Sequence, residues 1–336
     1  MIPRSHSLAA ATAALLFALV AGLGTWEAAG WIGKPFPGFL LLGNGVIASA
    51  GGHDWPAHEH APLFQHRVVA VDGQPLAAAS DLERIVRARP AGTPFHYTLR
   101  FEDRTFERTI PSRLFELDDF AMLFGVYLLN GGVLAGCAVA ILLAGRMHAS
   151  ARAVLPFLLV SAGWGLSAID LYGPYRWFRF HALCESLLWA TALKLALCYP
   201  APVAALAGLP APALAPYAVA AVLAVVYQAV LMDPSAYVTV HLLATSALGA
   251  SLLALTLCLV GRYFWRAPAA VRAQLQVLAV GAVLALSPIV ALTLTEPLTG
   301  GSAPQNAVGF TSFLFFLSLG YAALGGPQPR TDAARR

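Results

Sequence analysis

The stretch from Phe120 to Ala144 reads FAMLFGVYLLNGGVLAGCAVAILLA and contains no charged side chain in 25 consecutive residues. About 20 predominantly apolar residues are enough for a helix to cross the hydrocarbon core of a bilayer. The stretch therefore predicts a membrane-spanning helix. The whole 336-residue chain has the same character, because 58% of its residues are hydrophobic and only 11% are charged. An ordinary soluble enzyme, with about 25% charged residues, is excluded by this composition.

Six further uncharged segments have a similar length, and one more is interrupted by only two charges, Glu185 and Lys194. The uncharged segments are Leu8 to Leu23, Phe120 to Ala144, Ala153 to Ile169, Ala213 to Met232, Val238 to Val260, Val277 to Thr295 and Ala307 to Leu324, and the interrupted one is Ala182 to Tyr199. Without the interrupted segment the loops on either side of it would lie on inconsistent sides of the membrane. We expect an α-helical polytopic membrane protein with about eight transmembrane helices.

The positions of the arginines predict the orientation, because basic loops are retained in the cytoplasm. With the N-terminus inside, the cytoplasmic side receives Arg4, Arg146, Arg152, Arg262, Arg266, Arg272, Arg330, Arg335 and Arg336. Outside the soluble segment, the opposite side receives only Arg176 and Arg179. We expect a bacterial inner-membrane protein with both termini cytoplasmic. The first span resembles a secretory signal but is expected to remain as an uncleaved anchor.

One segment is predicted to fold in water. The chain has 21 basic and 17 acidic residues, 38 in all, and 21 of these 38 lie between Trp26 and Asp119. Strand-like runs separated by turn formers are Phe39 to Leu42, Val46 to Ser49, Arg67 to Val71, Phe95 to Phe101 and Arg104 to Ile110. Ser80 and Glu83 have the spacing of a capping box before a short helix from Asp81 to Arg89. The expected division is an anchor (1–25), a small α+β extracytoplasmic domain (26–117), a seven-helix block (118–325) and a cytoplasmic tail (326–336).

The segment from Arg67 to Arg100, RVVAVDGQPLAAASDLERIVRARPAGTPFHYTLR, resembles a PDZ domain of the bacterial type. Such domains bind an extended peptide between a sheet edge and a helix. The resemblance implies peptide-binding residues Gly38, Phe39 and Leu41 on the strand and Leu82 and Ile85 on the helix. The loop that receives a free carboxylate in this family keeps only its second half here, and Pro37 supplies no backbone N–H.

A wider resemblance covers nearly the whole chain. The phrases DDFAMLFGVYLLNGGVLAG (from Asp118), AIDLYGPYRWFRF (from Ala168), LCYP (ending at Pro200) and VRAQLQVLAVGAVLALSP (from Val271) occur in an order similar to the sensory half of bacterial PDZ-containing seven-helix membrane histidine kinases. In that family a kinase domain follows the last span. Since this chain stops at Arg336, we expect no kinase activity in it and a separate signalling output protein as partner.

Ionisable residues inside membrane spans are costly and are therefore candidates for function. Asp170, Tyr172, Arg176 and Glu185 are candidate ligand residues at the outer rim of the membrane block. For Glu185 we expect a partner among His181, Arg176, Arg179 and Asp170. Lys194 lies nine positions further on the opposite face of the same helix, so the two cannot pair. Pro156, Pro288, Gly131, Gly132 and Gly136 predict kinks and close helix packing.

Metal and redox chemistry have little support in the sequence. One loop holds His53, Asp54, His58, Glu59, His60 and His66, but the spacing matches no closed site, so a solvated loop is favoured over metal binding or proton sensing. The four cysteines lie within predicted spans and form no CxxC pair. Phosphate-binding loops and the motifs of membrane proteases are absent. We expect no cofactor, no metal and no enzymatic activity.

The preferred hypothesis is a sensory module that receives a peptide, lipid or small ligand and passes the signal to another protein. Two alternatives remain open: a PDZ-based scaffold that binds extracytoplasmic protein partners, and a transporter that uses Glu185 and Lys194. The expected partners are a peptide or protein at the PDZ-like domain, an output protein and membrane lipids, with no nucleic acid. A homodimer is also open.

Overall fold

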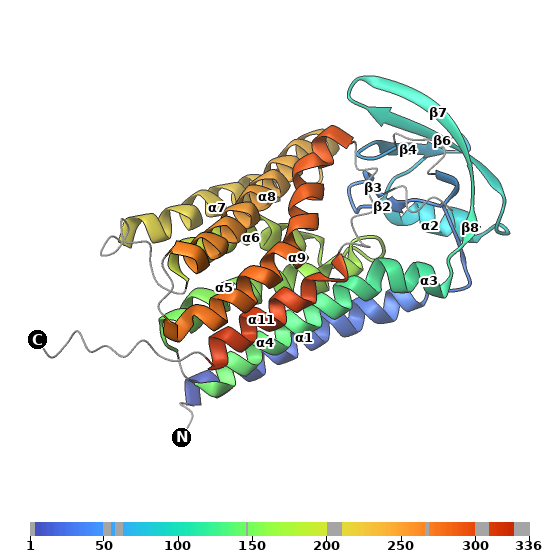
Figure 1. The fold of residues 1–336 in the computed structure, drawn as a ribbon. Coiled ribbons are helices and arrows are strands. Elements are labelled where there is room, and N and C mark those ends of the chain that lie inside the picture. The colour runs from blue at the N-terminus through green and yellow to red at the C-terminus, as the bar shows by residue number, and fades with distance from the viewer. Residues whose placement is uncertain are drawn as a thin grey trace, which may run out of the picture.

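The computed structural model describes residues 4–49, 55–57, 63–145, 147–199, 210–265, 269–299 and 309–325. Within these ranges the fold is mostly helical, with a small α+β domain at one end of a long helix bundle (Figure 1). The bundle helices are α1 (Arg4–Ala29), α3 (Leu117–Phe120), α4 (Val126–Ala144), α5 (Ala149–Ser167), α6 (Phe178–Cys198), α7 (Pro210–Val230), α8 (Pro234–Trp265), α9 (Ala269–Thr299) and α11 (Ser312–Gly325). A π-helical turn, η2 (Ala121–Gly125), joins α3 to α4, and a 3₁₀ turn, η3 (Ala168–Asp170), follows α5.

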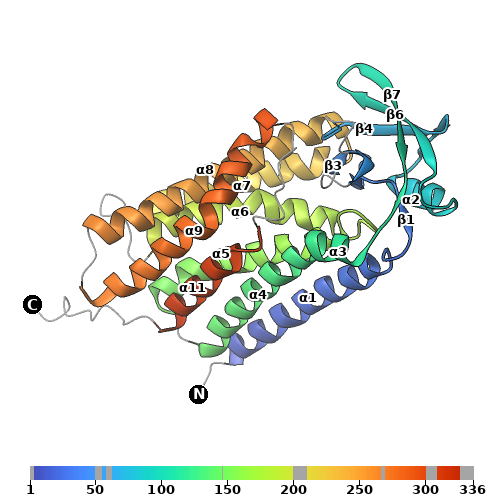
Figure 2. The same ribbon diagram turned by 45° about the vertical axis from the view of Figure 1, so that its right-hand side comes forward.

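Six of the long helices form a closed ring. The neighbouring pairs are α4 with α5, α5 with α6, α6 with α8, α8 with α9, α9 with α11, and α11 with α4. Outside this ring, α1 packs along α4 and α5, and α7 packs along α6 and α8 (Figure 2). A continuous apolar core fills the ring, with Leu134, Leu158, Leu195, Leu255 and Phe315 among its buried members.

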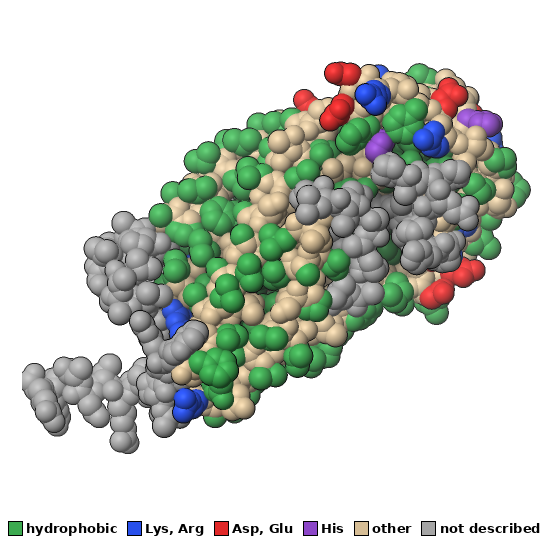
Figure 3. Space-filling model, turned by 45° about the horizontal axis from the view of Figure 1, so that its top comes forward, with side chains coloured by type: hydrophobic (Ala, Val, Ile, Leu, Met, Phe, Trp, Pro, Cys, Tyr) green, Lys and Arg blue, Asp and Glu red, His purple; other side chains and the backbone are tan. Residues whose placement is uncertain are grey.

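The described part of the chain contains six helical segments that are long and apolar enough to cross a membrane. They are Ser5–Ala29, Leu117–Ala144, Ala149–Asp170, Phe178–Cys198, Pro234–Phe264 and Arg272–Thr295. Two further predicted spans coincide with apolar helices that are shorter, Leu214–Val230 and Ser312–Leu324. The chain is therefore a multi-pass helical membrane protein. Figure 3 shows hydrophobic side chains spread over the helical body, as expected for a surface that faces lipid.

The described residues of the α+β domain form three small antiparallel sheets. The largest has the strand order β5 (Gln74–Pro75), β4 (Arg67–Val71), β6 (Pro94–Phe101) and β7 (Arg104–Pro111). Separate pairs are formed by β2 (Leu40–Leu41) with β3 (Ile47–Ser49), and by β1 (Pro35–Phe36) with β8 (Arg113–Leu114). One helix, α2 (Ala79–Arg87), lies between β5 and β6 in the chain.

The α+β domain agrees with the sequence pattern in its longer elements and differs at the helix start. β4 and the β6–β7 hairpin match the predicted runs to within one residue. The predicted capping box of Ser80 and Glu83 is wrong, because α2 begins two residues earlier. The Asp81 carboxylate accepts the Ala78 N–H at 3.0 Å, while Glu83 pairs with Arg87 one turn along. In the same way α1 continues to Ala29, past the expected anchor boundary at residue 25.

The domain is packed tightly onto the helix ends. One apolar cluster joins Leu42 and Val46 of the β2–β3 turn to Phe178, Tyr227 and Tyr237 of α6, α7 and α8. Asn44 in the same turn donates a hydrogen bond from its side-chain amide to the Leu231 carbonyl at 3.0 Å. A second cluster surrounds Phe115 and Phe124 and joins β1 and the end of α1 to the start of the α3–α4 helix. Burial on this scale fixes the domain to the bundle rather than leaving it on a free linker.

Close helix packing depends on one of the three glycines that the sequence singled out. A Cβ on Gly131 would lie 2.6 Å from the Leu166 side chain and 3.2 Å from the Leu166 backbone nitrogen. At Gly132 and Gly136 a Cβ would meet nothing within 4 Å. The prediction of close packing is therefore confirmed for Gly131, where α4 meets α5, and is wrong for the other two.

Candidate functional site

Residues 171–177 connect η3 to α6 and form a tight loop between the helix ends and the α+β domain, named here the rim loop. Asp170 shapes this loop. Its backbone carbonyl accepts the Gly173 and Tyr175 N–H groups at 3.5 and 3.3 Å, and its carboxylate accepts the Trp177 N–H at 2.8 Å. Tyr175 has a φ of +61°, a left-handed conformation that is uncommon for a bulky residue. The loop is thus held in one strained arrangement.

Tyr175 of the rim loop reaches the groove between β2 and α2, where the sequence predicted a bound peptide. Phe39, Leu41 and Leu82 line this groove and are 1%, 4% and 2% exposed. Tyr175 packs against the same apolar cluster. The space left in the groove is only about 30 Å³. A peptide side chain entering here would have to displace Tyr175.

The other two residues predicted to bind peptide are placed differently. Gly38 is buried and has a φ of +81°, and a Cβ at this position would lie 3.5 Å from the Pro56 side chain and 3.7 Å from the Pro111 carbonyl oxygen. Ile85 is half-buried on α2 and packs at the edge of the domain core. The five predicted residues thus lie close together, in or beside the groove that Tyr175 of the rim loop enters.

The remaining rim residues connect the loop to the helices. Tyr172 packs in the aromatic cluster with Phe124, at a ring-centroid distance of 6.4 Å. Arg176 forms an ion pair with Glu27 of α1 at 2.8 Å. The rim loop therefore contacts α1, the α3–α4 helix and the α+β domain at once.

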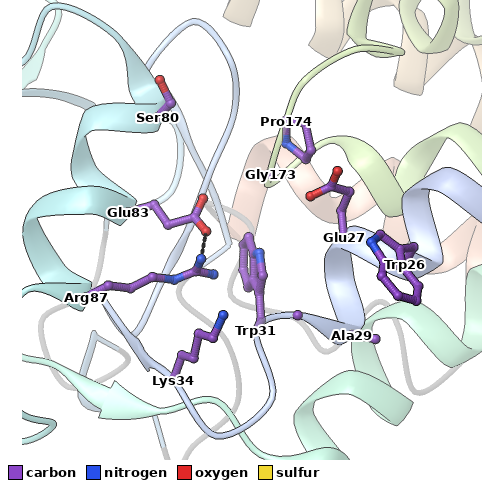
Figure 4. Close-up of a pocket in the computed structure, with 11 residues that line it drawn as sticks. Trp26, Glu27, Ala29, Trp31, Lys34, Ser80, Glu83, Arg87, Gly173 and Pro174 are labelled. Atoms are coloured by element: carbon purple, nitrogen blue, oxygen red, sulfur yellow. Dashed lines mark ion pairs between the residues drawn. The ribbon is translucent and has the colours of Figure 1, made fainter.

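Beside the rim loop is a cleft of about 490 Å³, bounded by the end of α1, by α2 and by Gly173 and Pro174 (Figure 4). Its charged lining residues are Glu27, Lys34, Glu83 and Arg87, and its aromatic lining residues are Trp26 and Trp31. The Arg87 guanidinium lies over the Trp31 ring at 5.9 Å from the centroid and pairs with Glu83. This cleft joins opposite charges to aromatic faces at the end of a membrane-spanning helix.

Glu185 is buried in the helix bundle, and its carboxylate contacts side chains from two other helices. One carboxylate oxygen accepts the Tyr227 hydroxyl at 2.9 Å, and the other lies 2.8 Å from Nδ1 of His241. Three of the four partners expected for Glu185 are wrong: Arg176 pairs with Glu27, Arg179 bonds to Gln228, and Asp170 holds the rim loop. The fourth, His181, interacts electrostatically with Glu185. Nδ1 of His181 lies 3.1 Å from the Ser167 hydroxyl and from the Trp164 carbonyl.

Lys194 and Glu185 are held apart, as their spacing on α6 predicts. The Lys194 ammonium lies 5.1 Å from the centroid of the Tyr217 ring on α7. Cation–π contact of this kind satisfies a partly buried lysine without a carboxylate. The two charges in this span therefore have separate structural partners.

Two titratable groups stand out in the α+β domain. His66 is buried and stacks on Phe101 at 4.6 Å, and burial lowers the pKa of its imidazole below 6.5, despite the Phe64 carbonyl at 3.0 Å. For Asp72, burial raises the pKa, but the His96 N–H at 2.9 Å and the Arg89 guanidinium at 2.7 Å outweigh it, so the net pKa is lowered. His53, Asp54, His58, Glu59 and His60 lie outside the described residues; among those described, no group of three metal-ligating side chains occurs.

Comparison with known proteins identifies no relative of this chain. No protein-family model matches the chain, no curated protein is significantly similar to it, and no solved structure matches it.

Trp31 of the cleft and Tyr227 beside Glu185 were not predicted from the sequence as functional residues. Trp31 follows the first span directly, and tryptophan at the end of a span is typical of the membrane interface. The position of Trp31 in the sequence is thus enough to predict that it lies near the membrane interface. Tyr227 lies among apolar residues of α7, and only the packing of α7 against α6 brings its hydroxyl to Glu185.

Proposed function

We infer that this chain is a signal-receiving module of a bacterial inner membrane. In this proposal a PDZ-like domain and the outer ends of the helices respond together to a ligand, and a separate output protein reads the change. The carrying observation is the rim loop, which contacts the groove of the domain through Tyr175 and α1 through Arg176. A movement of the domain would therefore move the helix ends to which it is fixed.

The element order of the domain supports a PDZ-like assignment. The helix α2 follows the β4–β5 turn and lies beside β2, and a groove runs between β2 and α2. In PDZ domains this groove receives the peptide by strand addition. Here Tyr175 takes the place that a peptide side chain would enter, so ligand binding and release of the rim loop would be coupled.

The proposal is tested by photo-crosslinking in native membranes with a bait at each end of the molecule. One bait replaces Arg104 in the β6–β7 hairpin, and the other replaces Ala149 at the start of α5. Both residues are exposed. The β6–β7 hairpin and the α4–α5 turn lie at opposite ends of the molecule (Figure 1). Capture of a kinase, cyclase or other signalling enzyme by the Ala149 bait is the expected result.

Capture of extracytoplasmic proteins alone, through the Arg104 bait, would favour the scaffold and contradict signal transfer through the helices. A bait at Val222, on the exposed face of α7 within the bundle, is the matched control because it should report lipid and membrane neighbours only.

A further inference from the structure

The cleft in Figure 4 lies at the end of a helix that is long and apolar enough to cross a membrane. The candidate span Ser5–Ala29 ends in this cleft, and Trp26, one turn earlier, is 80% exposed. Exposed tryptophan at the end of a span is characteristic of the headgroup region. The occupant of the cleft is therefore expected to come from the membrane interface.

An exposed apolar stripe on α1 leads toward the cleft. Leu8, Leu15, Leu19, Leu23 and Trp26 are each exposed and recur at intervals of three, four or seven residues. Such spacing places side chains on one face of a helix. Acyl chains could lie along this face while the attached headgroup enters the cleft.

The charges of the cleft fit a headgroup that carries both signs. In the described part of the chain Lys34 makes no ion pair, and the Arg87 side chain, which pairs with Glu83, is still 28% exposed. Both groups are donors suited to a phosphate. In the view of Figure 4 their head groups lie on one side of the Trp31 ring, and the Glu27 carboxylate lies on the other. The Glu27 carboxylate pairs with Arg176 through Oε1 at 2.8 Å, but its side chain is 38% exposed, so a primary ammonium can share this carboxylate and contact the indole faces.

We propose that this cleft binds the phosphoethanolamine headgroup of a membrane phospholipid, with the phosphate at Lys34 and Arg87 and the ammonium at Glu27. The inference names a ligand class for the module but does not depend on an output protein. Lipid binding is measured without a signalling readout, so it can succeed or fail separately from the proposed function.

The test is native mass spectrometry of the full chain in detergent, titrated with phosphatidylethanolamine, phosphatidylglycerol or phosphatidylcholine. We expect phosphatidylethanolamine to bind best. Lys34→Ala should weaken its binding by about tenfold, the loss that corresponds to one charge-assisted hydrogen bond. Lys34 has no ion pair to break, so its variant keeps the fold. Arg87→Gln should act in the same direction, and Glu27→Gln should remove the preference over phosphatidylglycerol.

Arg104→Gln, on the distant hairpin, is the matched control and should leave lipid binding unchanged. Equal binding of the three lipids with no effect of Lys34→Ala would overturn the proposal. Full competition by inorganic phosphate at the concentration at which glycerophosphoethanolamine competes would also overturn it, because the site would then be a simple anion site. A stronger preference for phosphatidylcholine would assign the aromatic faces to a quaternary ammonium and reject the ethanolamine headgroup.

Discussion

Tyr175 combines a left-handed backbone with a side chain inserted into the core of a different domain. A non-glycine residue in this conformation costs about 1–2 kcal/mol, so its surroundings must hold it there. The hydrogen bonds from the loop backbone to Asp170 and the contacts in the β2–α2 groove keep Tyr175 in this conformation.

Tyr175→Ala is expected to lower the free energy of unfolding by about 2 kcal/mol, because a partly buried ring leaves a cavity in the groove. Tyr175→Phe keeps the ring and should remain within about 0.5 kcal/mol of the wild type. Denaturant unfolding followed by tryptophan fluorescence measures both variants. Equal stability of the Ala and Phe variants would show that the ring does not fill the groove.

The pKa of buried His66 predicts a pH dependence of the α+β domain. The unfolded chain binds a proton to this side chain near pH 6.5, whereas the folded domain binds it only at lower pH. Stability is therefore complete above pH 6.5 and falls as the pH drops from 6.5 toward the lowered folded-state pKa.

Thermal melts of wild type and His66→Phe between pH 5 and pH 7.5 are the measurement, and the Phe variant should lose most of the slope in that window. Asp72 also has a lowered pKa, but its contribution is present above pH 3.8 and is lost only below it. Asp72→Asn should therefore leave the slope near pH 6 unchanged. An unaltered slope in His66→Phe would assign the effect to another group.

At the scale of the elements, α4 and α5 approach closely where Gly131 faces Leu166 and Gly165. Gly131→Ala is expected to destabilise the purified protein by about 1–3 kcal/mol, because the added methyl group forces α5 away. Gly136→Ala in the same helix has open space and higher helix propensity, so it should be neutral or slightly stabilising. Differential scanning fluorimetry in detergent compares the two. A lower midpoint for Gly136→Ala than for Gly131→Ala would contradict this packing.

The sequence predicts elements well where one element carries its own pattern. The valine-rich run Arg67–Val71 and the long uncharged run before Ala144 each contain enough residues to specify a strand or a helix. The two-residue strands Pro35–Phe36 and Arg113–Leu114 exist only because they pair with each other. Nothing local to either of them predicts that partner.

The sites are harder to predict for the same reason. The position of Glu185 shows that it needs a partner but not which helix supplies it, and the Tyr227 and His241 side chains come from α7 and α8. Periodicity places a residue on a face of its own helix, whereas the rotation of the neighbouring helix follows from packing. Tyr175 was not anticipated because its role depends on a contact between two domains.

At the scale of the whole molecule, α1 begins and α11 ends at the end of the bundle opposite the α+β domain. With both termini cytoplasmic, as proposed, the β6–β7 hairpin must lie outside and the α4–α5 turn inside. An Asp103→Cys variant should react with a membrane-impermeant maleimide in intact spheroplasts, and Ala149→Cys should react only after permeabilisation. The reverse pattern would invert the orientation and reject an extracytoplasmic domain.

We infer that the α+β domain and the helix ends move as one coupled unit through the rim loop. Hydrogen–deuterium exchange in lipid nanodiscs, comparing wild type, Tyr175→Phe and Tyr175→Ala, measures this coupling. We predict that the Ala variant exchanges faster both in α2 and in the helix ends next to the rim loop, η3 and the first turn of α6, while the Phe variant matches the wild type. Faster exchange confined to α2, with η3 and α6 unchanged, would show a domain that is only tethered to the bundle and would contradict coupling through the rim loop.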